Sequence, residues 1–136
     1  MGDSFPFTVG TGVYRDAYYL SMRAFYGQRC GTAVDLSPRF PQYKYEACHL
    51  KDGEYHASSG KKGHKDSGKG WHDAGDYGKY VVNSGISTGT LLLAYDWYKD
   101  RIGATSLDLP ESGNKIPDIL NEVKWNLDWM LTMQDS

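Results

Sequence analysis

The stretch from Tyr77 or Lys79 to about Lys99 constrains the fold more than any other part of the sequence. Apolar residues recur there at helical spacing, and small residues fill most positions between them, as in the run VVNSGISTGTLLLAY. Across four turns almost no charged side chain interrupts the pattern. A helix without a polar face is enclosed by its neighbours instead of lying on a surface. We therefore expect a mainly helical protein that surrounds this helix, with Gly85 and Gly89 allowing close contact.

Two further helices are indicated by the same periodicity. The first covers about Arg15–Tyr26 and stops before Gly27, and the last has Pro117 in its first turn and runs to about Gln134. No segment alternates cleanly enough to predict a strand. Three tryptophans fall on the apolar stripes of these helices and are expected in the core: Trp97, Trp125 and Trp129.

Charge and hydropathy exclude two classes of partner. The 136 residues include 15 basic and 17 acidic side chains, so the formal net charge is −2. This balance excludes a strongly cationic nucleic-acid-binding protein. The longest apolar run, Leu91–Ala94, is far shorter than the roughly 20 residues that a membrane span needs. Met1–Ser4 contain no basic region followed by an apolar one, so no signal peptide is visible.

Residues 28–70, between the first two helices, show no hydrophobic periodicity and are rich in glycine. Irregular loops beyond roughly 12–15 residues are uncommon unless they are functional or held in place. We expect the most polar part, Ser58–Lys69, to be a solvated excursion, because its lysines and glycines lack the spacing of a phosphate-binding loop. The rest of the loop needs something that holds it.

Two cysteines and two histidines are candidates for holding the loop. They have the spacing C-x17-C-H-x22-H: Cys30, Cys48, His49 and His72. Two thiolates and two imidazoles make a tetrahedral zinc set, which would tie the end of the first helix to the middle of the loop. A disulfide between the two cysteines, with ordinary polar histidines, is the alternative. His56 and His64 are alternative fourth ligands.

The densest group of chemically active residues is GWHDAGDYGKY, residues 70–80. Asp73 and Asp76 lie among glycines just before the apolar helix, so a tight turn could direct both carboxylates into one cleft. The helix dipole would favour their ionised form, which suits a general base or a metal ligand. The alternative is that one of them simply caps the helix. Trp71 and Tyr77 are candidates for stacking on a sugar, or else for packing beneath the turn.

This segment and its continuation, GWHDAGDYGKYVVNSGISTGTLLLAY, resemble the catalytic domain of glycoside hydrolase family 9, the inverting β-glycanases. The similarity extends to Tyr14-Arg15-Asp16, Gln28-Arg29-Cys30-Gly31, Ala47-Cys48-His49 and Ile116–Glu122, and so to nearly the whole chain. The resemblance implies a mainly α fold: part of an (α/α)6 barrel with a long loop pinned by zinc. Residues 1–136 would then be the N-terminal portion of a catalytic domain, and incomplete.

The resemblance also implies roles for the two aspartates. Asp76 would be the general base that deprotonates water, and Asp73 would help to hold that water. An inverting enzyme needs a carboxylic acid on the opposite face of the sugar. In the family this acid is a glutamate near the far end of the catalytic domain, and neither Glu111 nor Glu122 matches its motif. The expected activity is hydrolysis of β-1,4-glycosidic bonds in cellulose or a related β-glucan, with this portion alone inactive.

Cofactors, partners and location follow from the same resemblance. Some family members carry a structural zinc on ligands of these types, which implies zinc at Cys30, Cys48, His49 and His72. Family resemblance further implies a calcium site in the missing part of the domain, an immunoglobulin-like domain before it, and a secreted or periplasmic enzyme. Two alternatives stay open: an exo-β-glucosaminidase of the same family, and a zinc-stabilised polysaccharide-binding module without catalysis.

Overall fold

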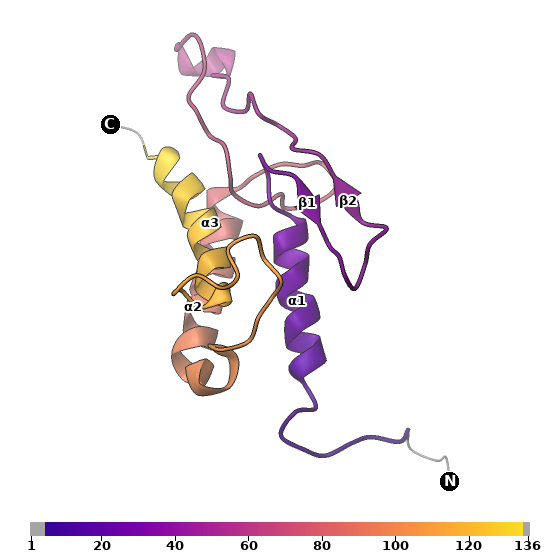
Figure 1. Cartoon of the computed structure of the whole chain (residues 1–136). Coiled ribbons are helices and arrows are strands. Elements are labelled where there is room, and N and C mark those ends of the chain that lie inside the picture. Colours follow the sequence, from indigo (N-terminus) through magenta and orange to yellow (C-terminus); the bar gives the residue numbers. More distant parts are fainter. Residues whose placement is uncertain (1–4, 135–136) are drawn as a thin grey trace.

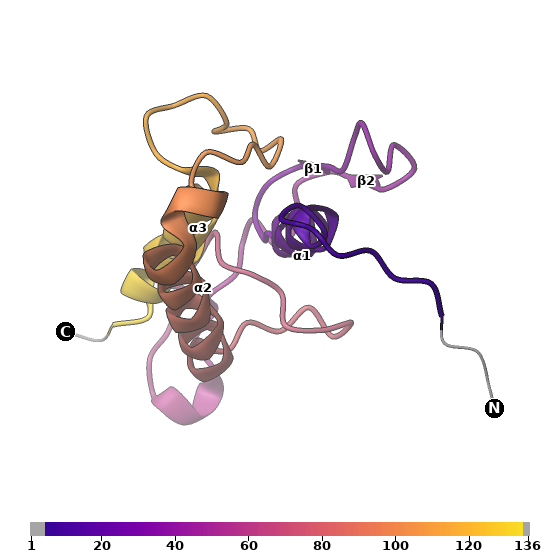
Figure 2. The same cartoon turned by 90° about the horizontal axis from the view of Figure 1, so that it is seen from below.

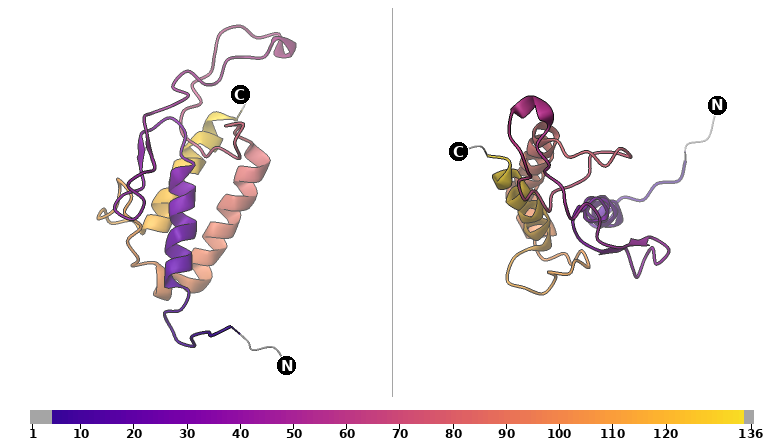
Figure 3. Two further views of the ribbon diagram at one scale, coloured as in Figure 1. Left: turned by 90° about the vertical axis from the view of Figure 1, so that its right-hand side faces the viewer. Right: turned by 90° about the horizontal axis from the view of Figure 1, so that it is seen from above.

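The computed structural model describes residues 5–134. Met1–Ser4, on which the signal-peptide interpretation rests, lie outside the described residues. Three α-helices dominate: α1 (Arg15–Gly27), α2 (Val81–Ile102) and α3 (Asp118–Thr132). Helices α1 and α3 run in one direction and α2 runs in the opposite one (Figure 1 and Figure 3, left). Among the described residues, no helix has both the length and the hydrophobicity to cross a membrane.

The helix boundaries agree with the periodicity to within a few residues. Helix α2 begins at Val81, slightly later than expected, with Tyr80 as its N-cap, and Tyr98 interrupts it with a non-helical φ of −124°. Helix α3 begins directly after Pro117. The pair of strands β1 (Val34–Asp35) and β2 (Lys44–Tyr45) was not predicted, since two residues are too few for an alternating pattern. A 3-10 turn, η1, covers Ala57–Ser59.

Helix α3 is the centre of the packing, because it contacts both α1 and α2. Figure 2 looks nearly along α1 and shows α2 and α3 together on one side of it. Nine residues from α1, β1, α2, α3 and the loops form the apolar core: Met22, Tyr26, Val34, Trp71, Leu91, Leu107, Leu109, Ile119 and Val123. Trp129 is also buried, as expected, and Trp125 is partly buried against this core.

Helix α2 is not enclosed, and this expectation was wrong for the described residues. One side packs on α3, and the other exposes apolar side chains, among them Val82, Ile86 and Trp97. Trp97 is 67% exposed, so its placement in the core was also wrong. An added Cβ at Gly85 would meet only Met130 Cε at 3.8 Å, and one at Gly89 would meet nothing within 4 Å. Neither glycine is therefore needed for close helix contact here.

The long loop between α1 and α2 has two parts. Residues 58–64 are exposed, as the solvated excursion predicts, and they project beyond the helices at the top of Figure 1. An isolated β-bridge between Glu54 and His64 closes this projection at its base. The remainder returns to the helices, where Ser67 is buried, so the solvated excursion is shorter than the expected Ser58–Lys69.

Candidate functional site

The site is assembled where the end of α1 meets the segment that leads into α2. Arg29 and Trp71 form an antiparallel β-bridge. The bridge is flanked by hydrogen bonds from Cys30 N to Gly70 O (2.9 Å) and from His72 N to Gln28 O (2.8 Å). Gly70 has a φ of +81°, and an added Cβ would lie 2.7 Å from the ring of Trp129. This pairing puts Cys30 and His72 on the same face of the bridge, diagonal to each other.

The structure brings the four predicted metal-ligating residues into one cluster. Each residue offers one ligand atom, and these atoms all lie within 4.8 Å of one another: Cys30, Cys48, His49 and His72. The Cys48 Sγ–His72 Nε2 distance is 3.4 Å. Bonds of about 2.3 Å to sulfur and 2.0–2.1 Å to nitrogen put neighbouring ligands of a tetrahedral zinc about 3.3–3.8 Å apart. The donor set therefore fits a four-coordinate metal, and the Cys48–His72 distance falls within this range.

The alternatives for these residues are not adopted. Both cysteines are free thiols, so no disulfide joins Cys30 to Cys48. His56 instead accepts a hydrogen bond from Ser58 N and caps the 3-10 turn. His64 forms a backbone β-bridge with Glu54 at the base of the exposed projection and is not part of the cluster.

A buried lysine stands beside the cluster. Lys79 Nζ donates to the carbonyl oxygens of Ser67 (2.7 Å) and Lys69 (3.1 Å) and lies 3.1 Å from the Asp52 carboxylate. Burial raises the pKa of the Cys30 thiol to about 11, and the Lys79 ammonium opposes this rise. Lys79 therefore joins two separate parts of the loop and supplies positive charge where a thiolate ligand needs it. No spacing in the sequence indicated this role.

The two predicted catalytic carboxylates lie on an exposed turn directly after His72. Backbone hydrogen bonds close the turn, from Asp73 N to Gly78 O (2.8 Å) and from Tyr77 N to Ala74 O (3.0 Å). The Asp73 carboxylate accepts from Asn83 Nδ2 at 2.9 Å. Asp73 also lines a cavity of about 140 Å³ between the end of α1 and the start of α2.

Asp76 is held as a carboxylate by two local donors. Its Oδ1 accepts from Gly78 N (2.9 Å) and its Oδ2 accepts from the Tyr80 hydroxyl (3.1 Å). These hydrogen bonds, led by the one from Gly78, lower the pKa of Asp76 below its usual value. Local hydrogen bonds thus take the role expected of the α2 dipole, and neither aspartate caps this helix, whose N-cap is Tyr80. Ionised Asp76 is a carboxylate in open solvent, able to accept a proton from water.

The two candidate sugar-binding aromatics differ in exposure. Trp71 is only 5% exposed, lies 4.9 Å from the ring of Phe25 and donates its indole N–H to Glu122 at 2.7 Å. Trp71 therefore packs beneath the turn, the second of the two roles considered for it, and is too buried to stack on a sugar in this structure. Tyr77 is 58% exposed, and its ring packs against the imidazoles of His49 (5.5 Å) and His72 (5.2 Å).

A buried ion network connects α3 to the site, and sequence reasoning missed it. Arg29 lies between Glu111 (2.9 Å) and the fully buried Glu122 (3.0 Å), and its guanidinium stacks 4.5 Å from the Trp125 ring. Burial raises the pKa of Glu122, while Arg29 and the Trp71 N–H oppose the shift. Glu122 thus accepts hydrogen bonds from both residues of the β-bridge, Arg29 and Trp71. These two residues directly precede Cys30 and His72 in the sequence. Its occupation by two donors excludes it as a freely accessible acid.

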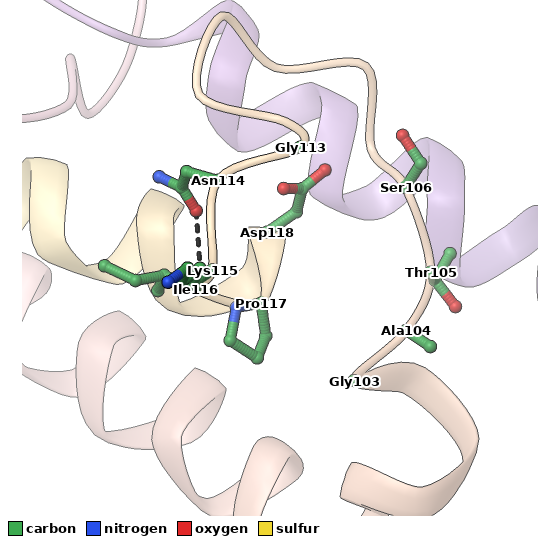
Figure 4. Close-up of a pocket in the computed structure, with 10 residues that line it drawn as sticks. All are labelled: Gly103, Ala104, Thr105, Ser106, Gly113, Asn114, Lys115, Ile116, Pro117 and Asp118. Atoms are coloured by element: carbon green, nitrogen blue, oxygen red, sulfur yellow. Dashed lines mark hydrogen bonds between the residues drawn. The ribbon is translucent and has the colours of Figure 1, made fainter.

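A second cavity has no comparable set of available functional groups. A cavity of about 460 Å³ lies between residues 103–106 after α2 and residues 113–118 before α3 (Figure 4). Its carboxylate, Asp118, already accepts hydrogen bonds from Leu107 N at 2.8 Å and from the Ser112 hydroxyl. Asn114 Oδ1 accepts from Ile116 N at 2.8 Å, the bond dashed in the figure. These groups complete the connector, whereas the turn at Asp73 and Asp76 has two exposed carboxylates and is the candidate site.

Comparison with known proteins gives this site its context. The sequence profile of Glycosyl hydrolase family 9 matches residues 14–136. The chain belongs to this family. Endoglucanase D of Acetivibrio thermocellus is 44% identical over 134 residues, which are 98% of this chain and 21% of that protein. This family 9 chain therefore spans about a fifth of the length of that curated relative.

Solved structures agree with the family and the fold. A metagenome-derived glycoside hydrolase family 9 endoglucanase is 41% identical, with a TM-score of 0.81 over 90% of this chain and 23% of that one. A Zn-binding triple mutant of the family 9 endoglucanase J30 is 33% identical, with a TM-score of 0.81 over 97% of this chain and 26% of that one. The chain thus has the mostly helical fold of part of an (α/α)6 barrel.

Proposed function

We propose that this chain carries the water-activating side of an inverting β-1,4-glucanase that acts on cellulose or a related β-glucan. The observation that supports the proposal most directly is the environment of Asp76. Its carboxylate is exposed, is kept ionised by Gly78 N–H and the Tyr80 hydroxyl, and lies on the same turn as Asp73. Family membership and the endoglucanase relatives supply the bond and the substrate class.

In this proposal Asp76 takes a proton from a water molecule as the water attacks the anomeric carbon. Asp73, fixed by Asn83, accepts the second O–H of the same water and orients it. The glycosidic oxygen receives its proton from a carboxylic acid on the other face of the sugar, outside this chain. Glu111 and Glu122 are not assigned to that role, since both bind Arg29. The exposed face of Tyr77 is the proposed stacking surface for a sugar ring.

Asp76→Asn in the natural protein that contains this sequence tests the base. General acid–base groups contribute about 10²–10⁴-fold to rate, so we expect turnover of a soluble β-glucan to fall by at least about 100-fold. Asp66→Asn is the matched control, because Asp66 Oδ1 also accepts from a backbone N–H two residues on, that of Gly68. Turnover within about twofold of wild type for Asp76→Asn would exclude it as the base.

The pH dependence tests the source of the lowered pKa. The base works only when ionised, so activity falls as pH drops through the pKa of Asp76. Tyr80→Phe removes one of the two hydrogen bonds to the carboxylate, so its pKa rises and the acidic limb of kcat/KM moves to higher pH. Tyr43→Phe, in the exposed loop, should leave the limb in place. If the acidic limb of kcat/KM stays at the wild-type pH in Tyr80→Phe, the limb does not report the pKa of Asp76.

We also propose that the Cys/His cluster binds zinc. The donor set is the argument, since two thiolates and two imidazoles are a characteristic zinc combination. Four protein ligands leave no position for a reacting water, so the metal would cross-link the loop. The calcium site and the immunoglobulin-like domain concern residues outside this chain and stay predictions.

Metal analysis of the purified chain after mild dialysis tests the zinc proposal. We expect about one zinc per chain, and Cys48→Ser should weaken binding by more than the 10–100-fold that loss of an outer-shell partner costs. His64→Ala, outside the cluster, should retain one zinc. Less than a tenth of an equivalent in the wild-type chain would reject the site.

A further inference from the structure

The Cys/His cluster and the Asp73–Asp76 turn are joined by one residue pair. The Nε2 atom of His72 faces Cys48 Sγ at 3.4 Å, inside the cluster. The other ring nitrogen, Nδ1, lies 2.9 Å from the carbonyl oxygen of Tyr77, the residue that follows Asp76. One imidazole therefore has one nitrogen in the cluster and the other on the turn.

We propose that His72 and Tyr77 are positioning residues through which ligation at the cluster holds the Asp76 turn in its working conformation. A histidine that ligates a metal through Nε2 carries its proton on Nδ1, and this N–H is usually donated to a carbonyl or a carboxylate. Here the acceptor is the Tyr77 carbonyl. The inference rests on the proposed metal site and on Asp76 as the base, and adds a connection between them.

The backbone at Tyr77 explains why the turn needs such support. Tyr77 has a φ of 57°, which is uncommon for a residue other than glycine and has a conformational cost. Its N–H bonds Ala74 O, and the next residue, Gly78, bonds both Asp73 N and the Asp76 carboxylate. A shift of the Tyr77 peptide would therefore displace the partners of both aspartates.

The side chain of Tyr77 also connects the turn to the Cys/His cluster. Its ring lies edge-on to His72, with centroids 5.2 Å apart, and 5.5 Å from His49. The two imidazole rings are themselves 4.9 Å apart. The ring of Tyr77 thus contacts both histidine ligands, while much of the side chain stays exposed. A change in the cluster is transmitted through backbone and ring together.

Two cysteine substitutions separate ligation from the hydrogen bond. His72→Cys keeps four ligand positions but removes the Nδ1–H that reaches Tyr77. His49→Cys changes the ligand set in the same way, to three cysteines and one histidine, and leaves that hydrogen bond intact. Cobalt(II), which reports tetrahedral thiolate coordination by its visible absorption, establishes that each variant of the 136-residue chain binds metal.

Amide hydrogen exchange at Asp73, Tyr77 and Gly78 is the readout, measured by NMR with zinc and with a chelator. In the wild-type chain and in His49→Cys, we expect zinc to slow exchange at these amides about two- to tenfold, the effect of one net hydrogen bond. In His72→Cys, zinc should leave them unchanged. Equal slowing in all three proteins, or no slowing in a wild-type chain that has bound zinc, would overturn the connection and leave the metal site standing.

A second measurement decides the matter if His72→Cys fails to bind metal. Long-range ¹H–¹⁵N spectra of the zinc-loaded wild-type chain identify which nitrogen of His72 carries the proton. We expect a protonated, slowly exchanging Nδ1. A proton on Nε2 would overturn the inference, whereas a wild-type chain that binds no zinc at all would reject the proposed metal site itself.

Discussion

The two sides of helix α2 are reversed relative to what hydrophobicity alone would select. The side that packs on α3 buries Ser84 and Thr88 together with Leu91, whereas the opposite side leaves Val82 73% exposed and Ile86 69% exposed. The reversal shows that hydrogen-bonding partners and side-chain size, as well as apolar area, decide which side of a helix is buried.

The partner that selects the buried side is on α3. Asn126 is fully buried; it accepts a hydrogen bond from the Ser84 hydroxyl (3.3 Å) and donates one to Thr88 Oγ1 (3.0 Å). Small hydroxyl side chains let the two helices approach while they satisfy this amide. A helix of this sequence inside a larger domain would have its apolar side covered as well, and this chain spans about a fifth of its curated relative endoglucanase D.

The largest expected effect concerns the polar groups that α3 buries. Glu122→Gln leaves the buried Arg29 without one of its two carboxylates, and loss of one partner of a buried pair costs about 3–5 kcal/mol. We expect a loss of about 3 kcal/mol in the free energy of unfolding by urea, because Glu111 remains. Glu111→Gln, at the more exposed end of the network, should cost about 1 kcal/mol or less. Equal costs would mean that burial of the pair is unimportant.

The contact between α3 and the buried side of α2 comes next. Asn126→Ala removes the amide that both hydroxyls use, and buried groups left without a partner cost about 1–3 kcal/mol. We expect about 2 kcal/mol in the same unfolding experiment. Thr90→Ala, which removes an exposed hydroxyl that bonds Ile86 O of the same helix, is the control. A cost below about 0.5 kcal/mol would show that apolar packing alone selects this side of α2.

Replacing glycine by alanine should stabilise the chain on helix α2 and destabilise it at the bridge next to Trp129. Gly89→Ala adds a methyl group where nothing lies within 4 Å and improves helix propensity, so we expect a gain of up to about 1 kcal/mol. Gly70→Ala places the same group 2.7 Å from the Trp129 ring at a φ of +81° and should destabilise the chain. The thermal unfolding midpoint should rise in Gly89→Ala and fall in Gly70→Ala.

The smallest effect is expected on the apolar side of α2. Ile86→Ala removes a side chain that is largely exposed, so the free energy of unfolding of this chain should change by no more than about 0.5 kcal/mol. Leu91→Ala, on the buried side of the same helix, should cost about 2 kcal/mol. A large cost for Ile86→Ala would show that this side is covered in solution.

Much of the site could be predicted because its residues lie close together in the sequence or have distinctive chemistry. The DAGDYG segment indicated a turn with two carboxylates, and two cysteines with two histidines indicated a metal site. The network of Arg29 and Glu122 could not be predicted, since the two residues are 93 positions apart and neither has a local pattern. The same holds for Lys79, whose partners come from two separate parts of the loop, Asp52 and residues 67–69.

By itself, the sequence determined the three helices, the four candidate ligands and the pair of aspartates, because periodicity and residue chemistry are local properties. Only the tertiary structure decided which side of α2 is buried, that Trp71 packs inward while Tyr77 stays exposed, and that Asp76 owes its lowered pKa to Gly78 and Tyr80. The physical reason is that burial and hydrogen bonding depend on partners supplied by other segments. A periodic pattern indicates which residues can be buried. Which of them are buried depends on the helix that packs against them.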